Sequence, residues 1–177
     1  MIHQDLLSLL QLIYSATTKV TLALKTPSPT YKASIAPLKD LSEKVSAILH
    51  CTNLLSSSLH GTTLKQETVS VVKDVIESLV SLLSLYSEPN NHSQDEYLIR
   101  TGTVHDLINK ARDLPADNAS AVRRLWDRDT ESLDDALREV ADMLTDDDHQ
   151  EDGWDELGFD ADQKMDATEI RRATQVR

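Results

Sequence analysis

The 177-residue chain has few of the residues that form turns, disulfide bonds and aromatic cores: four glycines, five prolines, one cysteine and one phenylalanine. So little glycine and proline disfavours a turn-rich β-sandwich or β-barrel. The single cysteine, Cys51, excludes a disulfide framework and a cysteine-based zinc cluster. Aromatic residues make up only 4% of the chain, so any core must be built from Leu, Val, Ile and Ala.

The sequence also lacks long apolar runs and a clear targeting segment. No apolar stretch approaches the ~18–20 residues that span a bilayer, so we expect no membrane segment. The apolar residues 6–13 resemble the core of a signal peptide, but Asp5 precedes them and no basic residue does. The absence of disulfide bonds fits the reducing environment of the cytosol or nucleus.

Negative charge is concentrated in one segment. The chain carries a net charge of −12, yet residues 1–128 are neutral overall. Residues 129–162 hold 15 acidic side chains against Arg138 alone. This distribution disfavours nucleic acid as a direct ligand.

Apolar residues recur at the spacing of one buried helix face in five segments. Pro27 and Pro29 end the first segment and Gly61 ends the second, in which Pro37 marks either the start of the helix or a bend. We therefore predict an all-α fold, an up-and-down antiparallel bundle of about five helices over residues 1–145. The predicted helices cover about residues 3–26, 30–60, 63–86, 94–113 and 118–144.

The third of these segments has the widest apolar face, so we expect it to be the central helix, with Leu79 buried. Gly102 lies in the middle of the fourth, where glycine costs about 1 kcal/mol relative to alanine, and we interpret it as permitting a close helix crossing. The fifth segment has an apolar stripe expected to face the bundle, formed by Ala121, Val122, Leu125, Trp126, Leu133, Ala136, Leu137, Val140 and Leu144.

Polar residues at segment starts predict helix caps. The third helix has a capping-box pair in Thr63 and Gln66, and the fourth has Ser93 with Glu96. The fifth is capped by Asp117 or Asn118.

Periodicity ends after residue 145, and the like charges that follow resist compaction. We predict an acidic linker at residues 146–163 and the start of a further helix at residues 164–177. Trp154, Leu157 and Phe159 are large apolar residues within this acidic stretch. They either tether the linker to the bundle or form a short recognition motif for a partner. A calcium loop beginning at Asp148 is disfavoured, because Phe159 stands where a bidentate Glu is required.

Motifs for enzymatic chemistry are missing. The sequence has no glycine-rich nucleotide loop, no metalloprotease motif and no nucleophile elbow, and its six histidines are isolated from one another. A catalytic pair of His105 and Cys51 is the alternative to a small buried thiol and an ordinary histidine on a helix face, and we favour the latter. We expect no catalytic residue, cofactor or metal site.

Arg123, Arg124 and Arg128 flank Trp126 on the polar side of the fifth segment. Arg123 and Arg124 are candidates for binding phosphate or an acidic partner surface. The alternative is that the arginines offset local carboxylates, as in the pairs Arg124–Asp127 and Arg128–Glu131.

Three stretches of the sequence resemble the cyclin-D-binding protein (GCIP) family. That family has a Gly-x-Thr-Leu start to a long apolar helix, here residues 61–64, and a Pro-x-Asp-Asn break, here within residues 114–118. It also has a Leu-Gly-Phe in an acidic linker, here residues 157–159. The likeness extends over nearly the whole chain, including residues 61–86 and 97–122. Family members continue into a second helical half, so by this resemblance the chain looks like an N-terminal fragment.

The resemblance implies an all-helical, non-enzymatic protein of the nucleus and cytoplasm that binds cyclins and helix-loop-helix regulators. No catalytic or metal residue is carried over. The sequence has no Lys/Arg cluster before a helix, which argues against direct DNA contact. Its second and third helices are longer than those of helix-loop-helix domains, which puts that dimerisation mode in doubt.

We therefore expect a protein-binding regulator or adaptor in cell-cycle or transcriptional control. An alternative function is an acidic chaperone or assembly factor that shields a basic client protein. Binding of a basic client should weaken steeply with salt, whereas binding through apolar helix faces should not.

Overall fold

The computed structural model describes residues 2–25, 28–87 and 95–145. It divides the chain into two compact units, Met1–Arg124 and Leu125–Arg177. The predicted linker at 146–163 and the predicted helix at 164–177 lie outside the described residues. The second unit is thus described only through its part of one helix.

The described residues form helices joined by short connections and contain no strand, which confirms the predicted all-α class. The elements are α1 (Ile2–Ala23), α2 (Tyr31–Asn53), α3 (Ser57–His60), α4 (Thr62–Ser87), α5 (Glu96–Lys110), the 3₁₀ turn η1 (Ala111–Asp113) and α6 (Asn118–Thr145). α6 begins in the first unit and continues in the second.

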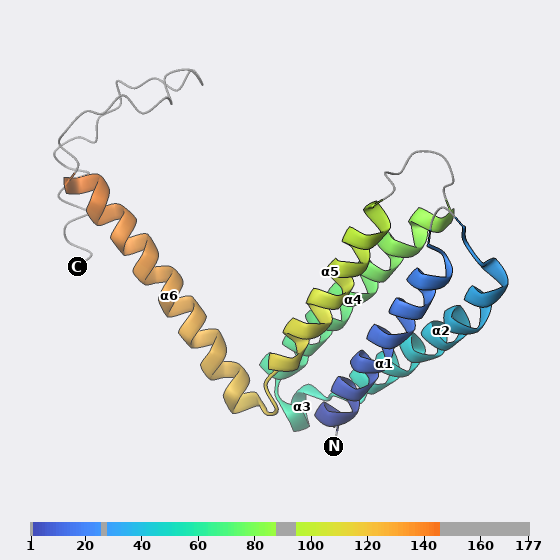
Figure 1. The fold of residues 1–177 in the computed structure, drawn as a ribbon. Helices are drawn as coiled ribbons and strands as arrows, with labels where there is room; N and C mark the ends of the chain where they lie inside the picture. Colours follow the sequence, from blue (N-terminus) through green and yellow to red (C-terminus); the bar gives the residue numbers. More distant parts are fainter. Residues whose placement is uncertain (1, 26–27, 88–94, 146–177) are drawn as a thin grey trace. The chain divides into compact units, whose positions relative to one another are not determined.

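The first unit is an up-and-down bundle of α1, α2, α4 and α5 (Figure 1). α1 packs against α2 and α5, while α4 packs against α5 and α2, so each long helix lies beside two others. Consecutive long helices run antiparallel, as short connections require.

The core is aliphatic, as the scarcity of aromatic residues predicts. Leu79 on α4 is 3% exposed, which confirms its predicted burial. α4 is not more buried than α1, because each of these helices buries seven residues. The side chain of Val80 on α4 is exposed, so part of the wide apolar face of α4 lies outside the core.

The second predicted helix is interrupted. α2 ends at Asn53, and Ser56 is extended before the single turn of α3. The interruption allows Leu55 to turn into the bundle, where it is 5% exposed. The backbone N–H of Ser56 donates to Nδ1 of His60 at 3.1 Å, which satisfies a backbone group that the interruption leaves without a helical partner. Pro37 lies inside α2, which begins at Tyr31.

α1 is, by length and composition alone, apolar enough to cross a membrane. No continuous apolar run indicates this in the sequence, because the apolar positions of the helix are interspersed with polar ones. In the structure Leu6, Leu10 and Ile13 are buried in the bundle, so the apolar face of α1 serves as core.

The start of α4 is capped by a residue distant in sequence. The backbone N–H of Leu64 donates to Oδ1 of Asn118 at 3.1 Å. The predicted capping-box pair of Thr63 and Gln66 makes no such bond, and this prediction is wrong. The cap of α6 is confirmed, because Oδ1 of Asp117 accepts the N–H of Ser120 at 2.8 Å. Ser93, predicted to cap α5, lies outside the described residues.

Gly102 does not lie at a close helix crossing. A Cβ atom added there would meet no atom of another helix within 4 Å, so the interpretation drawn from its mid-helix position is wrong. Helix packing requires no glycine at this position.

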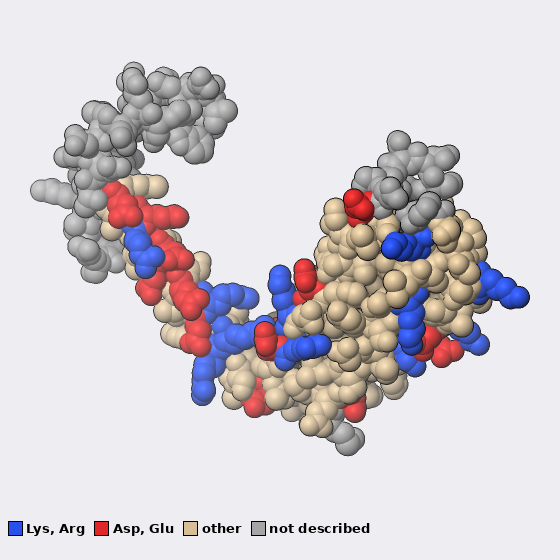
Figure 2. All heavy atoms as spheres, viewed as in Figure 1, with Lys and Arg blue, Asp and Glu red and all other residues tan. Residues whose placement is uncertain are grey.

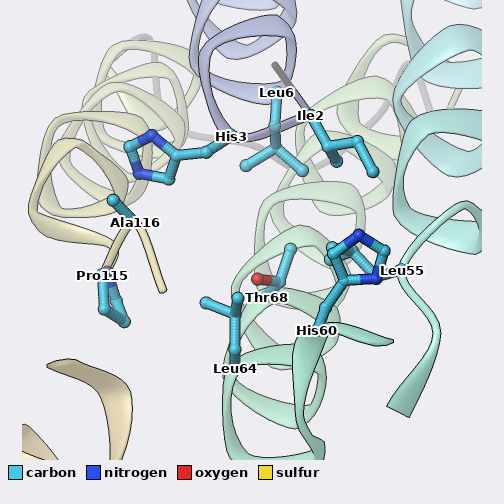
Figure 3. A pocket seen from close by; sticks show the side chains of 9 residues that line it. All are labelled: Ile2, His3, Leu6, Leu55, His60, Leu64, Thr68, Pro115 and Ala116. Atoms are coloured by element: carbon cyan, nitrogen blue, oxygen red, sulfur yellow. The ribbon is translucent and has the colours of Figure 1, made fainter. Parts of the chain in front are cut away.

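Packing leaves a pocket at one end of the bundle (Figure 3). The start of α1, the α3 turn, the first turns of α4 and the segment before α6 enclose it.

Candidate partner-binding surface

The second unit contributes an amphipathic stretch of α6 with an exposed apolar face. We name this face, together with the residue that begins it in the first unit, the α6 stripe. Trp126, Leu133 and Met143 are 73%, 66% and 69% exposed. The residues of the α6 stripe are alternately four and three positions apart, which is the spacing of a helix face that pairs with another helix. The α6 stripe consists of Val122, Trp126, Asp129, Leu133, Ala136, Val140 and Met143.

Of the residues predicted to face the bundle, Ala121 lies in the first unit and is buried there. Leu125 and Leu137 belong to the second unit and are exposed within it, so their packing against the bundle stays a prediction. The side chain of Leu144 lies outside the described residues. Periodicity identifies an apolar face, but it does not identify what covers that face.

The opposite face of α6 is strongly acidic (Figure 2). Arg138 pairs with Asp135 at 3.0 Å, so part of this charge is offset within the helix. The carboxylates on this face belong to Asp127, Glu131, Asp134, Asp135, Glu139 and Asp142. The helix therefore presents an apolar strip bordered by negative charge.

Asp129 is the charged residue within the α6 stripe. The guanidinium of Arg128 lies 3.3 Å from its carboxylate, and both side chains are exposed. A charged position in an otherwise apolar seam favours one register of pairing over others, because a shifted register would place the charge against apolar side chains.

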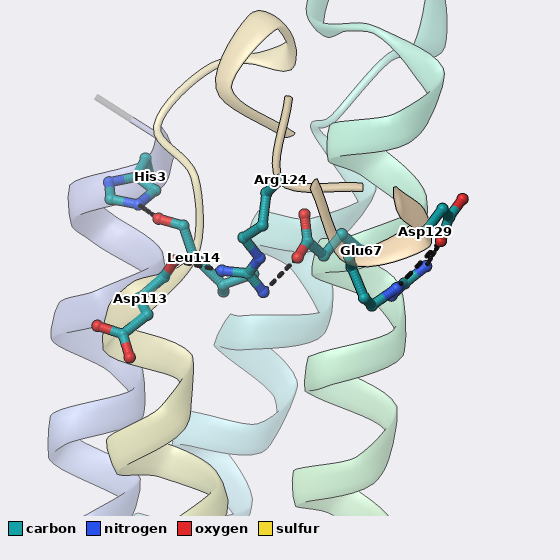
Figure 4. Close-up of polar contacts among 7 residues, drawn as sticks. His3, Glu67, Asp113, Leu114, Arg124 and Asp129 are labelled. Atoms are coloured by element: carbon teal, nitrogen blue, oxygen red, sulfur yellow. Dashed lines mark hydrogen bonds and ion pairs between the residues drawn. The ribbon is translucent and has the colours of Figure 1, made fainter. Parts of the chain in front are cut away.

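Arg124 ties the start of α6 to the bundle within the first unit (Figure 4). Its guanidinium forms an ion pair with Glu67 of α4 and donates a hydrogen bond to the carbonyl of Asp113. Beside it, Nε2 of His3 donates to the carbonyl of Leu114 at 2.9 Å. These contacts fix the segment between α5 and α6 against α1 and α4.

The arginine pairs expected from sequence spacing differ from those observed. Arg124 bonds to Glu67 rather than to Asp127, and Arg128 bonds to Asp129 rather than to Glu131. The guanidinium of Arg124 is thus occupied by intramolecular partners. Arg123 is exposed, and its role in binding stays a prediction. Trp154, Leu157 and Phe159 lie outside the described residues, so their role also stays a prediction.

His105 and Cys51 are not brought together. The Cys51 thiol is buried and donates to the carbonyl of Ile2, near the start of α1. His105 stacks on Tyr14, with ring centroids 3.7 Å apart. Cys51 thus contacts α1 at Ile2, whereas His105 contacts it at Tyr14. These two positions are about 18 Å apart along the helix, at 1.5 Å per residue.

The environment of Cys51 does not activate its sulfur. Burial, and secondarily the charge of Asp5, raises the pKa of the Cys51 thiol and keeps it protonated. Within the described part of the chain, no group of three or more His, Cys, Asp or Glu side chains could hold a metal ion.

Sequence reasoning missed two features of the first unit: the cap that Asn118 gives to α4, and the pocket beside His60 and Thr68. Both depend on contacts between segments far apart in the chain, which helix periodicity does not encode. The seam spacing of the α6 stripe, by contrast, is visible in the sequence.

Comparison with known proteins identifies a family. A family model described as "Grap2 and cyclin-D-interacting, N-terminal" matches residues 5–146. No curated protein matches the chain. No solved structure matches it either.

Proposed function

Because the chain belongs to the Grap2 and cyclin-D-interacting family, we propose that it is a protein-binding regulator or adaptor in cell-cycle or transcriptional control. Its partners on this proposal are cyclin-like proteins or helix-loop-helix regulators, and its site of action is the nucleus and cytoplasm. The proposal includes no catalytic activity.

The α6 stripe is the observation that carries this proposal. Large apolar side chains exposed in a contiguous strip are characteristic of protein interaction sites. Trp126 is a residue type enriched among interface hot spots. The family match extends to residue 146, so it includes the stripe as well as the bundle. A partner helix or an apolar groove could bury the stripe, while the acidic face stays in solvent.

Two variants of the full chain test this proposal, with binding to a purified D-type cyclin measured by titration calorimetry. Leu133→Asn places a polar group in the stripe, and we expect at least a tenfold loss of affinity. Glu131→Asn introduces the same residue on the opposite face and controls for helix propensity. We expect it to bind within about twofold of the parent, since rim charges contribute little to affinity.

Equal affinity of the two variants would show that the α6 stripe is not part of the interface. If the parent chain does not bind the cyclin, D-type cyclins are not its partners. The helical circular dichroism of both variants should match that of the parent. A loss of affinity is then caused by lost contacts with the partner and not by unfolding of the helix.

The acidic face of α6 supports a second candidate function, a chaperone or assembly factor for a basic client. Salt distinguishes the two functions. Affinity for a basic client should fall steeply between about 0.1 and 0.5 M salt, because exposed charges are screened over shorter distances. Affinity through the α6 stripe should change little over the same range.

A further inference from the structure

The pocket at the end of the bundle has the size and lining of a small-molecule site. Its volume is about 340 Å³, within the range of ligand pockets. Buried aliphatic side chains form much of its wall, including Leu6, Leu55 and Leu64 (Figure 3). All its lining residues belong to the first unit.

Thr68 supplies to this pocket a hydroxyl that has no hydrogen-bond partner within the described protein. The residue is 4% exposed, and its oxygen points toward the space between the lining side chains (Figure 3). Among the described residues, the other buried Ser and Thr hydroxyls each have a hydrogen-bond partner, and that of Thr68 has none. Those satisfied hydroxyls belong to Thr17, Thr21, Ser34, Thr52 and Thr101.

Thr68 also departs from the usual arrangement of a buried threonine in this fold. Thr17, Thr52 and Thr101 each donate to the carbonyl four residues earlier, at 2.7–2.8 Å. Thr68 lies within α4, where the same bond to Leu64 is open to it, yet its hydroxyl faces the pocket instead. Because this oxygen is not fully enclosed by protein, the hydroxyl is open to a hydrogen-bonding group that enters the pocket.

His60 supplies a second hydrogen-bonding group. Its Nδ1 accepts the backbone N–H of Ser56, so the neutral ring carries its proton on Nε2. Nε2 is therefore the hydrogen-bond donor of this ring, which lies on the pocket wall (Figure 3). Neither a lysine nor an arginine lines the pocket. Its ionisable lining residues are two histidines, of which His3 already donates to the carbonyl of Leu114. Because the wall has no permanent positive charge, the pocket favours an uncharged ligand over a carboxylate or a phosphate.

We propose that this pocket binds an uncharged amphiphile, an apolar body of about two fused rings with one hydrogen-bonding oxygen. Thr68 holds the oxygen, and the Nε2–H of His60 is the second donor available to it. The size follows from the volume, since an apolar cavity of about 150 Å³ holds benzene. The proposal is independent of the partner-binding function, because none of the α6 stripe residues lines the pocket.

Three probes of matched shape test the proposal on the full chain: 2-naphthol, naphthalene and 2-naphthoate. Their binding is followed by the NMR shifts of the methyl groups of Leu6, Leu55 and Leu64 and of the His60 ring. We expect 2-naphthol to shift these signals and to bind at least about fivefold more tightly than either of the other probes.

Two variants locate the contacts. Thr68→Val keeps the side-chain shape and removes the hydroxyl, so we expect about five- to tenfold weaker binding of 2-naphthol and unchanged binding of naphthalene. Ala116→Phe fills the pocket from its exposed edge and should abolish binding of every probe. Ala119→Phe introduces the same ring at an exposed position that does not line the pocket, and should bind like the parent.

Stability gives a readout that needs no ligand. Thr68→Val removes a hydroxyl without a partner, so its Tm should equal or exceed that of the parent. A lower Tm would show that the hydroxyl has a structural partner and would overturn the proposal. Absence of 2-naphthol binding, shifts that map elsewhere, or equal affinity for 2-naphthol and naphthalene would overturn it as well.

Discussion

At the scale of single residues, Gly61 and Gly102 occupy backbone positions with opposite requirements. Gly61 has a φ of 89°, in the left-handed region, and a Cβ atom there would collide with the side chain of Asn118. Gly102 lies within α5, with open space where a Cβ atom would stand. The first glycine is required by the turn before α4, whereas the second only weakens its helix.

Alanine substitution at these two positions should therefore have opposite effects. Gly102→Ala should raise the free energy of unfolding by about 0.5–1 kcal/mol, through helix propensity. Gly61→Ala should lower it by more than about 1 kcal/mol, because both the backbone and Asn118 must shift. Urea denaturation followed by circular dichroism measures both. A destabilised Gly102→Ala variant would mean that α5 has a neighbour close to this position.

His105 makes the stability of the bundle depend on pH. Its imidazole stacks on Tyr14, and its Nε2 lies 3.2 Å from the hydroxyl oxygen of Thr18. Burial lowers the pKa of His105 from its ordinary value of 6.5, while a hydrogen bond to the backbone of Tyr14 and the charge of Asp106 partly oppose this. The folded state therefore holds the ring neutral at pH values where the unfolded chain is already protonated.

The sign of the pH dependence follows from this lowered pKa. As pH falls below 6.5, the unfolded state takes up a proton first, so stability is lost until the pH passes the folded-state pKa. His105→Phe keeps a ring for stacking and removes the titration. The parent should lose more stability than this variant between pH 7.5 and pH 5.5, measured by urea denaturation. Equal losses would show that His105 titrates as in the unfolded chain.

At the scale of elements, α4 shows how burial differs between neighbouring positions on one helix. Leu79 is 3% exposed, and the adjacent Val80 is 62% exposed. Leu79→Ala should cost about 2–5 kcal/mol, because it leaves a cavity in the core. Val80→Ala should change stability by less than about 0.5 kcal/mol, because it removes little packing and alanine favours helix. Similar losses from both would mean that Val80 is covered in solution.

Helix periodicity predicts most elements of this fold but not their ends or neighbours. The apolar spacing locates α1, α4, α5 and α6, and the local cap at Asp117 is visible in the sequence. The break before α3 and the cap from Asn118 could not be predicted, because each depends on a tertiary contact. The sequence does not tell what covers the α6 stripe either, since an apolar face has the same periodicity whether or not another element packs on it.

At the scale of the whole molecule, the core belongs to the first unit. The buried hydrophobic side chains among the described residues lie between Leu6 and Ala121. Asn118, Ala121 and Arg124 are the residues of α6 that cap α4, enter the core and pair with Glu67. The first unit therefore needs only the first two turns of α6 for its own packing.

Two truncated chains test this division. Residues 1–124 retain these three side chains, so this fragment should unfold cooperatively, with a Tm within a few degrees of that of residues 1–177. Residues 1–116 lose the cap of α4, a buried alanine and the ion pair of Arg124, each of which stabilises the bundle. Their loss should lower the Tm by more than about 5 °C, since 1 kcal/mol shifts the Tm of a domain of this size by several degrees. Calorimetry of the three chains measures both differences. A large drop in Tm for residues 1–124 would show that the stability of the bundle depends on residues beyond Arg124. The α6 stripe would then contribute to folding, and its role in binding a partner would be in doubt.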